Sequence, residues 1–335
     1  MYHILANLNL FIVLSVLALS LIVLSKAADS LVDNAAKLSK ILGLSQLIIG
    51  ATIVSLGTTL PELSASVVAA LQGNGDFALG NAIGSIITNT SLILGIAALF
   101  GKIPTDKEAS QKLSMLIAAI MILFFTTIPY KIGNDNGLIP QWLGFILLLL
   151  VPVYIFYLIK RESNNNSEEK DHNAEKSIGI IAVFITKIFI TAFIIAVSAS
   201  ALVASAEVLA ERMGIPDVVI SSTLVAFGTS VPELSTCIAA ARSNHGGIAI
   251  GNILGANILN ILFVTGASAA LTPDGISVPQ SFYAIHFVGL AVVMGTFGFF
   301  AYNKKFHEIN KREGIILILI YAAYLGANIF NTFYR

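Results

Sequence analysis

Charged residues, cysteine and basic clusters are all scarce in this sequence of 335 residues. Asp, Glu, Lys and Arg together make up 11% of it, and the formal net charge is zero. Because no basic block stands out, we expect no nucleic-acid partner. The one cysteine, Cys237, excludes an intrachain disulfide. The five histidines show no spacing typical of a zinc or haem site, so we expect no cofactor.

Apolar residues, by contrast, make up 56% of the chain, and the mean hydropathy is +0.86. This is too apolar for a water-soluble globule of this size and predicts an all-α protein of the cell membrane. A transmembrane helix needs about 20 apolar residues, and ten stretches qualify. They are 7–28, 41–71, 76–100, 112–130, 138–160, 177–207, 215–242, 247–271, 280–303 and 314–334.

The only long polar segment, KRESNNNSEEKDHNAEK, covers residues 160–176 and has the composition of a flexible linker. We expect residues 1–160 to form a first five-helix repeat, 161–176 a linker, and 177–335 a second five-helix repeat. Fourteen Lys and Arg residues lie in loops on the linker's side of the membrane and three on the other side. The positive-inside rule therefore places the linker in the cytoplasm and both termini outside.

An internal duplication relates the two halves. Residues 50–95 align with residues 221–266 without a gap, at an offset of 171 positions, and 18 of the 46 pairs are identical. The identical pairs include Pro, Glu, Gly and Asn, which a shared apolar composition does not explain. The offset spans five helices, an odd number, so the second copy enters the membrane from the opposite side. The sequence therefore predicts an inverted-topology pair with a site at the repeat interface, as in many secondary transporters.

The centre of the repeat is GTTLPELSAS, beginning at Gly57, and its second copy is GTSVPELSTC, beginning at Gly228. Pro61 and Pro232 each remove a backbone donor and free the carbonyl four residues earlier. We therefore expect the second and seventh helices to be broken at these points. The exposed carbonyls carry partial negative charge. They belong to Ser55, Gly57 and Thr58 in the first copy and to Ala226, Gly228 and Thr229 in the second.

Glu62 and Glu233 directly follow the two prolines. A carboxylate deep in a bilayer is costly unless it is neutralised, so an intramembrane acid marks a functional site by default. The alternative is a protonated or lysine-paired glutamate that only locks two helices together. Lys187 is the one plausible intramembrane partner, and it cannot serve both copies.

The third and eighth spans add polar residues at helical spacing. Asn81, Ser85 and Asn89 recur every four residues and therefore share one helix face. We interpret Asn89 and its second-copy equivalent Asn260 as lining an ion site. Each span also carries a glycine pair, interpreted as close packing between helices. The pairs are Gly80 with Gly84 and Gly251 with Gly255.

Together these groups form an all-oxygen site, which suits calcium, sodium or another hard cation and does not suit zinc or copper. Two carboxylates are neutralised by one Ca²⁺, two Na⁺ or two protons. This equivalence is the condition for exchange, because either ion set stabilises the site and an empty site is penalised. A third Na⁺ would need neutral oxygens such as those of Thr59, Ser85 and Ser230.

The segments GTTLPELSAS with GNAIGSIITN, and GTSVPELSTC with GNILGANILN, resemble the alpha-repeats of the calcium/cation antiporter superfamily. The resemblance is closest to its prokaryotic sodium/calcium exchangers. It implies a transporter, not an enzyme, that exchanges Na⁺ for Ca²⁺ by alternating access as the first and sixth spans slide across the core. We expect it to act as a monomer in the lipid bilayer.

The resemblance also assigns ligands. Calcium would be held by Glu62, Glu233 and the carbonyls of Thr58 and Thr229. Sodium would use the glutamates together with further oxygens. These come from Thr59, Ser230, Ser85 and Asn89 and from the carbonyls of Ser55 and Ala226, with Asn260 lining the same site.

Two positions depart from the family pattern. Ala256 stands where the family has a serine, which removes a hydroxyl and leaves the sodium stoichiometry open. Asn260 replaces an aspartate of some relatives and argues against potassium co-transport. A proton-driven calcium antiporter is the alternative, because two protonated glutamates satisfy the same charge count. A passive cation channel would also line a pore with carboxylates, although the broken helices favour alternating access.

Overall fold

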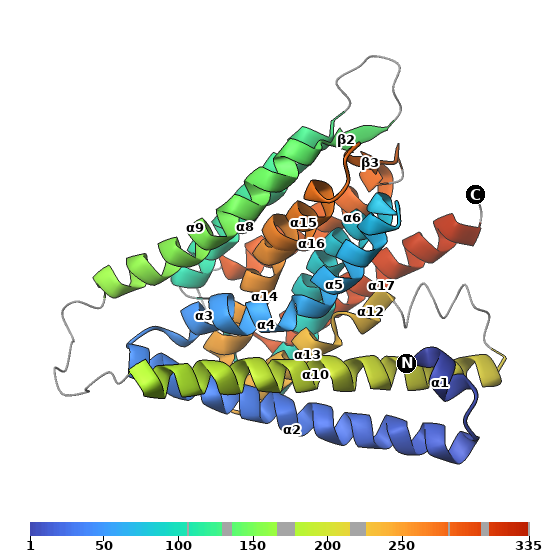
Figure 1. Cartoon of the computed structure of the whole chain (residues 1–335). Coiled ribbons are helices and arrows are strands. Elements are labelled where there is room, and N and C mark those ends of the chain that lie inside the picture. Colours follow the sequence, from blue (N-terminus) through green and yellow to red (C-terminus); the bar gives the residue numbers. More distant parts are fainter. Residues whose placement is uncertain are drawn as a thin grey trace.

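The computed structural model describes residues 1–105, 107–128, 136–165, 178–214, 226–280, 282–302 and 308–333 (Figure 1). Nearly all of these residues are helical, as the sequence predicts. The helices of the first half are α1 (Tyr2–Ala6), α2 (Leu10–Leu42), α3 (Gln46–Ile49), α4 (Ser55–Thr58), α5 (Leu60–Leu71), α6 (Gly75–Thr88), α7 (Leu94–Phe100), α8 (Lys107–Thr127) and α9 (Gln141–Asn165). Those of the second half are α10 (Ile178–Arg212), α12 (Ala226–Gly228), α13 (Val231–Arg242), α14 (Gly246–Leu259), α15 (Gly266–Ala270), α16 (Phe287–Ala301) and α17 (Lys311–Phe333).

Four π-helical turns interrupt or begin these helices. They are η1 (Gly50–Val54), η2 (Asn89–Ile93), η4 (Asn260–Thr265) and η5 (Phe282–His286). A π turn widens a helix by one residue and leaves backbone groups less regularly paired, and such turns are frequent at functional sites. Two of the four begin at Asn89 and Asn260, the two asparagines that the sequence assigns to an ion site.

Eight helical spans of the described residues are long and apolar enough to cross a membrane, and a ninth is bent. The bent span joins Gln46–Thr58 to Leu60–Leu71. Of the seventh expected span, 215–242, residues 215–225 lie outside the described residues and the rest forms α12 and α13. The structure therefore agrees with nine of the ten expected spans.

The two longest helices, α2 and α10, run side by side along one edge of the bundle (Figure 1). The expected end of the first span at residue 28 is wrong, because α2 continues to Leu42 and ends at Gly43 in a left-handed conformation with φ 66°. Small residues allow this continuation. Ala27, Ala28, Ala35 and Ala36 are buried and keep the helix close to its neighbours.

The centre of the bundle is formed by α6–η2–α7 and by α14–η4–α15. In the most apolar stretch of the span Gly246–Ala270, 89% of the residues are buried, against 11% for Lys311–Phe330. Glycine allows the closest approach: a Cβ atom on Gly251 would lie 2.3 Å from the carbonyl oxygen of Leu47, and one on Gly255 would lie 2.6 Å from Ala51 Cα. The packing interpretation of this glycine pair is confirmed. It is wrong for the pair Gly80 and Gly84, because a Cβ atom on Gly84 would meet nothing within 4 Å and one on Gly80 would lie 3.5 Å from the Phe282 ring.

Two short antiparallel ladders, which the sequence does not predict, join the halves. Strand β1 (Ile103–Pro104) pairs with β4 (Glu308–Ile309), and β2 (Gly137–Ile139) pairs with β3 (Ile276–Val278). The all-α expectation is corrected to this extent. Strand β4 begins 171 positions after β2 and strand β3 begins 173 positions after β1, so the two ladders occupy nearly corresponding places in the two halves.

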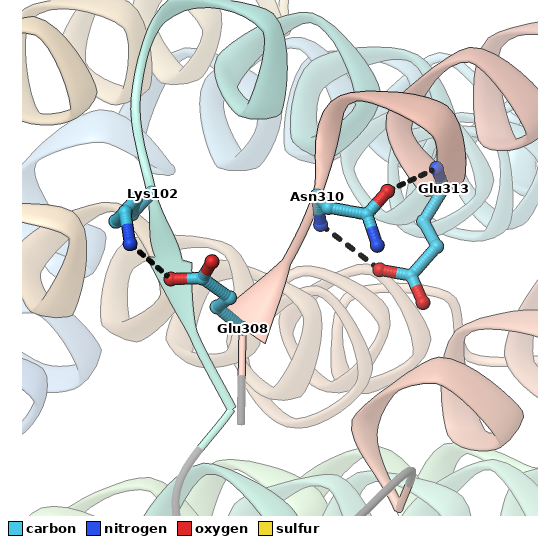
Figure 2. A network of polar contacts seen from close by, with 4 residues as sticks. All are labelled: Lys102, Glu308, Asn310 and Glu313. Carbon is cyan, nitrogen blue, oxygen red and sulfur yellow. Dashed lines mark hydrogen bonds and ion pairs between the residues drawn. The ribbon is translucent and has the colours of Figure 1, made fainter. Parts of the chain in front are cut away.

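Polar contacts fix the β1–β4 end of the molecule (Figure 2). Lys102 Nζ lies 3.1 Å from Glu308 Oε2. Asn310 and Glu313 form a capping box at the start of α17. The backbone N–H of Asn310 donates to Glu313 Oε2 at 2.9 Å, and that of Glu313 donates to Asn310 Oδ1 at 3.1 Å.

Candidate cation site

Both predicted helix breaks are present. In the first half, α4 ends at Thr58 and α5 begins at Leu60, with a bend of 44° between the two segments. In the second half, Thr229 and Ser230 form a turn between α12 and α13. Pro61 and Pro232 lie in the first turn of α5 and α13, where a proline needs no backbone donor. The chain therefore breaks just before each proline, and each break places a glutamate in the first turn of the next helix.

The side chains of Glu62 and Glu233 are both fully buried, with 0% exposure. The two carboxyl groups interact with each other, Ser230 lies beside Glu62, and Thr58 lies beside Glu233. Lys187 is not their counter-charge, because its side chain is exposed and its Nζ lies 5.4 Å from the centroid of the Phe184 ring. The structure thus joins the two repeats through an acid pair without a lysine partner among the described residues.

Most polar atoms around this pair have no hydrogen bond of acceptable geometry within the described part of the chain. They are Thr59 Oγ1, both carboxylate oxygens of Glu62 and Glu233, Asn89 Oδ1, Ser230 Oγ, and both polar side-chain atoms of Asn260. A buried polar group without a partner costs about 1–3 kcal/mol, and a charged group costs more. A hard cation coordinates carboxylate, hydroxyl and amide oxygens together, so these residues fit the expected ligand chemistry.

Contacts between helices place the asparagines near the glutamates. Helix α5, which carries Glu62, packs on η4, which begins at Asn260. Correspondingly, α13 with Glu233 packs on η2, which begins at Asn89. Each helix that carries an acid is therefore packed against the π turn of the other half, and both asparagines are at most 1% exposed.

Hydrogen bonds between the halves repeat at the sequence offset. Thr58 Oγ1 donates to Asn252 Oδ1 at 3.1 Å, and its equivalent Thr229 donates to Asn81 Oδ1 at 3.3 Å. The two amides also hold their own half. Asn81 Nδ2 donates to Ser66 Oγ at 2.9 Å, and Asn252 Nδ2 lies 3.8 Å from the sulfur of Cys237. Asn81 and Asn252 thus fix the threonines at the two breaks.

A second asparagine contact has no equivalent in the other half. Asn89 Nδ2 donates to Asn257 Oδ1 at 3.2 Å, and Asn257 Nδ2 donates to Thr90 Oγ1 at 2.7 Å. The equivalents of Asn257 and Thr90 are Ile86 and Ile261. The sequence interpretation missed Asn257 because it considered only positions that the two copies share. The signal that could have identified it is that a polar residue, Asn257, aligns with an apolar one, Ile86.

The other residues that the sequence predicts as ligands are buried or half-buried wherever their side chains are described. Ser55 is fully buried and its hydroxyl donates to the carbonyl of Thr52, while Ser85 is 4% exposed. Ala226 begins α12, and its side chain is not among those described. Thr229 is half-buried. Ala256 is fully buried, so the chain has an apolar methyl group where Ser85 supplies a hydroxyl in the first half.

A cavity of about 690 Å³ opens beside both breaks. It is lined by Gly57 and Pro61 of the first break, by Gly228 and Pro232 of the second, and by one side of α10. The cavity reaches Met1 and Glu207, which lie near α1 and the C-terminal end of α10. The cavity therefore extends from this end of the molecule to the two breaks.

These features define a multi-pass membrane protein in which both halves contribute a buried glutamate and unpartnered oxygen atoms to one region. Comparison with known proteins makes this class more specific. A family model described as "Sodium/calcium exchanger protein" matches residues 12–160 and 183–330. The chain belongs to this family, which consists of exchangers and not of enzymes.

Relatives cover nearly the whole chain. The sodium/calcium exchanger MaX1 of Methanosarcina acetivorans is 29% identical over 342 residues, which is 92% of this chain and 96% of its own. The putative antiporter CaxA of Alkalimonas amylolytica is 29% identical over 309 residues, with 91% and 94% covered. A solved structure of the sodium-calcium exchanger NCX_Mj superposes with a TM-score of 0.78 at 28% identity, covering 95% of this chain and 99% of that one.

Proposed function

We propose that this protein is a secondary active antiporter that exchanges Na⁺ for Ca²⁺ across the cell membrane. The observation that carries the proposal is the buried pair Glu62 and Glu233, which joins the two repeats and has no lysine partner among the described residues. One Ca²⁺ or two Na⁺ neutralise this pair, so the two ion sets compete for one site. The family assignment and the structural match to NCX_Mj support the same reading.

Calcium would be coordinated by Glu62, Glu233 and the carbonyls of Thr58 and Thr229. Sodium would share the glutamates and use the hydroxyls and amides around them. The unpartnered oxygens of Thr59, Ser230, Asn89 and Asn260 support this assignment, because each is a buried acceptor that a cation satisfies. The carbonyls of Ser55 and Ala226 and the hydroxyl of Ser85 complete the proposed sodium ligands.

The proposed architecture has ten transmembrane helices in two inverted repeats, 1–160 and 177–335, joined by a cytoplasmic linker at 161–176. Support comes from pairs that obey the 171-residue offset: the two helix breaks, the two threonine–asparagine bonds, and strands β2 and β4 of the two ladders. In Figure 1, α1 and the C-terminal end of α17 lie toward the same end of the molecule, as expected if both termini face outside.

Alternating access follows from the same arrangement. With the N-terminus outside, the cavity that reaches Met1 and Glu207 leads from the outer surface to the two breaks. Sliding of α2 and α10, which contact each other along one edge of the bundle, would close this path and open one on the other side. One chain supplies all the proposed ligands, which supports a monomeric transporter.

The test is calcium uptake into vesicles. Inside-out membrane vesicles are loaded with sodium or with acid, and ⁴⁵Ca uptake is followed under each outward gradient separately. Uptake driven by sodium alone supports the proposal. Uptake driven by acid alone favours a proton-coupled antiporter, which the charge of the acid pair also permits. Calcium flux that needs neither gradient would indicate a channel.

A further inference from the structure

Asn257 occupies a position that no part of the proposed coordination uses. It lies on α14 with 0% exposure, between two consecutive residues at the start of η2. Its Oδ1 accepts from Asn89 Nδ2 at 3.2 Å, and its Nδ2 donates to Thr90 Oγ1 at 2.7 Å. One amide from the second half thus contacts two residues of the first half, next to the proposed ion ligands.

The two bonds together orient the Asn89 side chain in the structure. Thr90 accepts from Asn257 Nδ2, and the oxygen of Asn257 therefore faces Asn89 and accepts there. Asn89 presents its Nδ2 to Asn257, which leaves its Oδ1 on the other side. That oxygen is buried and has no donor among the described residues. A buried acceptor in this position is satisfied by a cation.

The equivalent asparagine of the second half is not held in this way. Neither Oδ1 nor Nδ2 of Asn260 has a partner in the described part of the chain. The residue that would correspond to Asn257 is Ile86, which has no hydrogen-bonding side chain, and Thr90 corresponds to Ile261. No hydrogen bond among the described residues therefore orients the amide of Asn260, whereas the amide of Asn89 has its nitrogen bonded to Asn257 and its oxygen unpaired.

We propose that Asn257 is a positioning residue that holds the carbonyl oxygen of Asn89 toward the transported cation and so sets the sodium affinity of the site. The inference rests on the proposed sodium/calcium exchange. Asn257 acts through Asn89 and contacts no ion itself. The second half has Ala256 where the first half has Ser85, so it lacks that hydroxyl. Its neighbour Asn257 instead contributes indirectly, by orienting the ligand Asn89 of the first half.

The test uses the full-length protein and measures equilibrium ⁴⁵Ca binding to purified protein, with competition by Na⁺. In Asn257→Leu, which keeps the branched shape of the side chain and removes both hydrogen bonds, Na⁺ should compete about three- to tenfold less well, the effect of losing one oriented hydrogen bond. Ile86→Leu, at the equivalent position of the first half, is the matched control and should compete like the unmodified protein. Elution as a single monodisperse peak establishes that each variant is folded.

A double-mutant cycle separates positioning from a general structural effect. If Asn257 acts through Asn89, Asn89→Ala and the double variant Asn89→Ala/Asn257→Leu should show the same sodium competition. Additive losses would overturn the inference. Thr90→Val keeps Asn257 but removes the hydroxyl that accepts from it, so the amide of Asn257 can rotate. Sodium should then compete about twofold less well. Unchanged sodium competition in both Thr90→Val and Asn257→Leu would also overturn the inference.

The two proposals fail in different ways. If the unmodified protein binds no calcium that sodium displaces, the proposed function is wrong. If the unmodified protein shows normal competition and Asn257→Leu matches it, only the role of Asn257 is wrong.

Discussion

The two halves of the site are identical at some equivalent positions and different at others, and the two groups of positions have different roles. The shared positions contain the break, the acid and the threonine–asparagine bonds between the halves, such as Thr58 with Asn252 and its counterpart. The positions that differ, among them 85/256, 86/257 and 90/261, surround the asparagines on α6 and α14. The shared positions supply the two negative charges and the two helix breaks. The positions that differ give the two halves different neutral side chains around the proposed site.

The comparison predicts that the acids are equivalent. Glu62→Gln or Glu233→Gln leaves one carboxylate, which a single Ca²⁺ does not match in charge, so either change should abolish calcium exchange, a loss of at least about a hundredfold. ⁴⁵Ca uptake in proteoliposomes measures this. Glu308→Gln, which breaks only the contact with the exposed Lys102, is the control and should retain exchange.

Near-normal exchange by one of the two glutamine variants would show that the halves are unequal in charge as well. The proposed stoichiometry would then have to be abandoned for a site in which a single carboxylate binds the ion.

Helix packing also differs between neighbouring regions and can be tested by stability. A Cβ atom on Gly255 would lie 2.6 Å from the backbone of Ala51, whereas one on Gly295 of α16 meets no atom within 4 Å. Gly255→Ala should therefore destabilise the protein by about 1–3 kcal/mol through overpacking. Gly295→Ala should be neutral or slightly stabilising, because alanine favours a helix. Thermal unfolding in detergent compares the two variants, and equal midpoints would contradict the close packing of α14 on η1.

Sequence reasoning predicted the membrane class, the breaks and the acid pair because these depend on local chemistry. Proline removes a donor wherever it stands in a helix, and a carboxylate among apolar residues is costly in any topology. The duplication supplied the pairing of the halves. Asn81 and Asn89 were placed near the site for the same reason, since helical spacing fixes a shared face.

The other features depend on distances between segments that local patterns do not contain. Asn89 and Asn257 are 168 positions apart, and only the packing of η2 on α14 brings their amides together. The strands of the two ladders are two or three residues long, which is too short for a strand pattern. The end of α2 at Leu42 was missed because its last turns contain Lys and Asn, which a hydropathy criterion excludes and a helix tolerates.

Making the neutral ligands more alike should have a smaller effect than removing an acid. Ala256→Ser restores at α14 the hydroxyl that Ser85 supplies on α6, and it adds one oxygen near the proposed sodium ligands. Sodium should then compete against calcium about three- to tenfold better, the contribution of one contact with the strength of an ordinary hydrogen bond. Sodium titration of ⁴⁵Ca uptake measures the shift. An unchanged sodium dependence would mean that other oxygens already complete the site.

The smallest expected effect is at Cys237, which replaces the serine found at the equivalent position 66. Its sulfur lies 3.8 Å from Asn252 Nδ2 and donates to the carbonyl of Ala249 at 3.6 Å. Cys237→Ser would exchange these two weak contacts for ordinary hydrogen bonds, while the smaller oxygen leaves a slight gap in a fully buried position. These terms oppose each other, so the change in unfolding free energy should stay within about 1 kcal/mol.

Exchange should also be preserved in Cys237→Ser, because Asn252 would still accept from Thr58 at the first break. The matching change, Ser66→Cys, weakens the bond to Asn81 from the other side and should be equally mild. Proteoliposome uptake and thermal unfolding of both variants decide the matter. A loss of exchange above about tenfold in one variant alone would show that Asn81 and Asn252 are not interchangeable, and that the asymmetry of the site extends to the bonds that hold its two breaks.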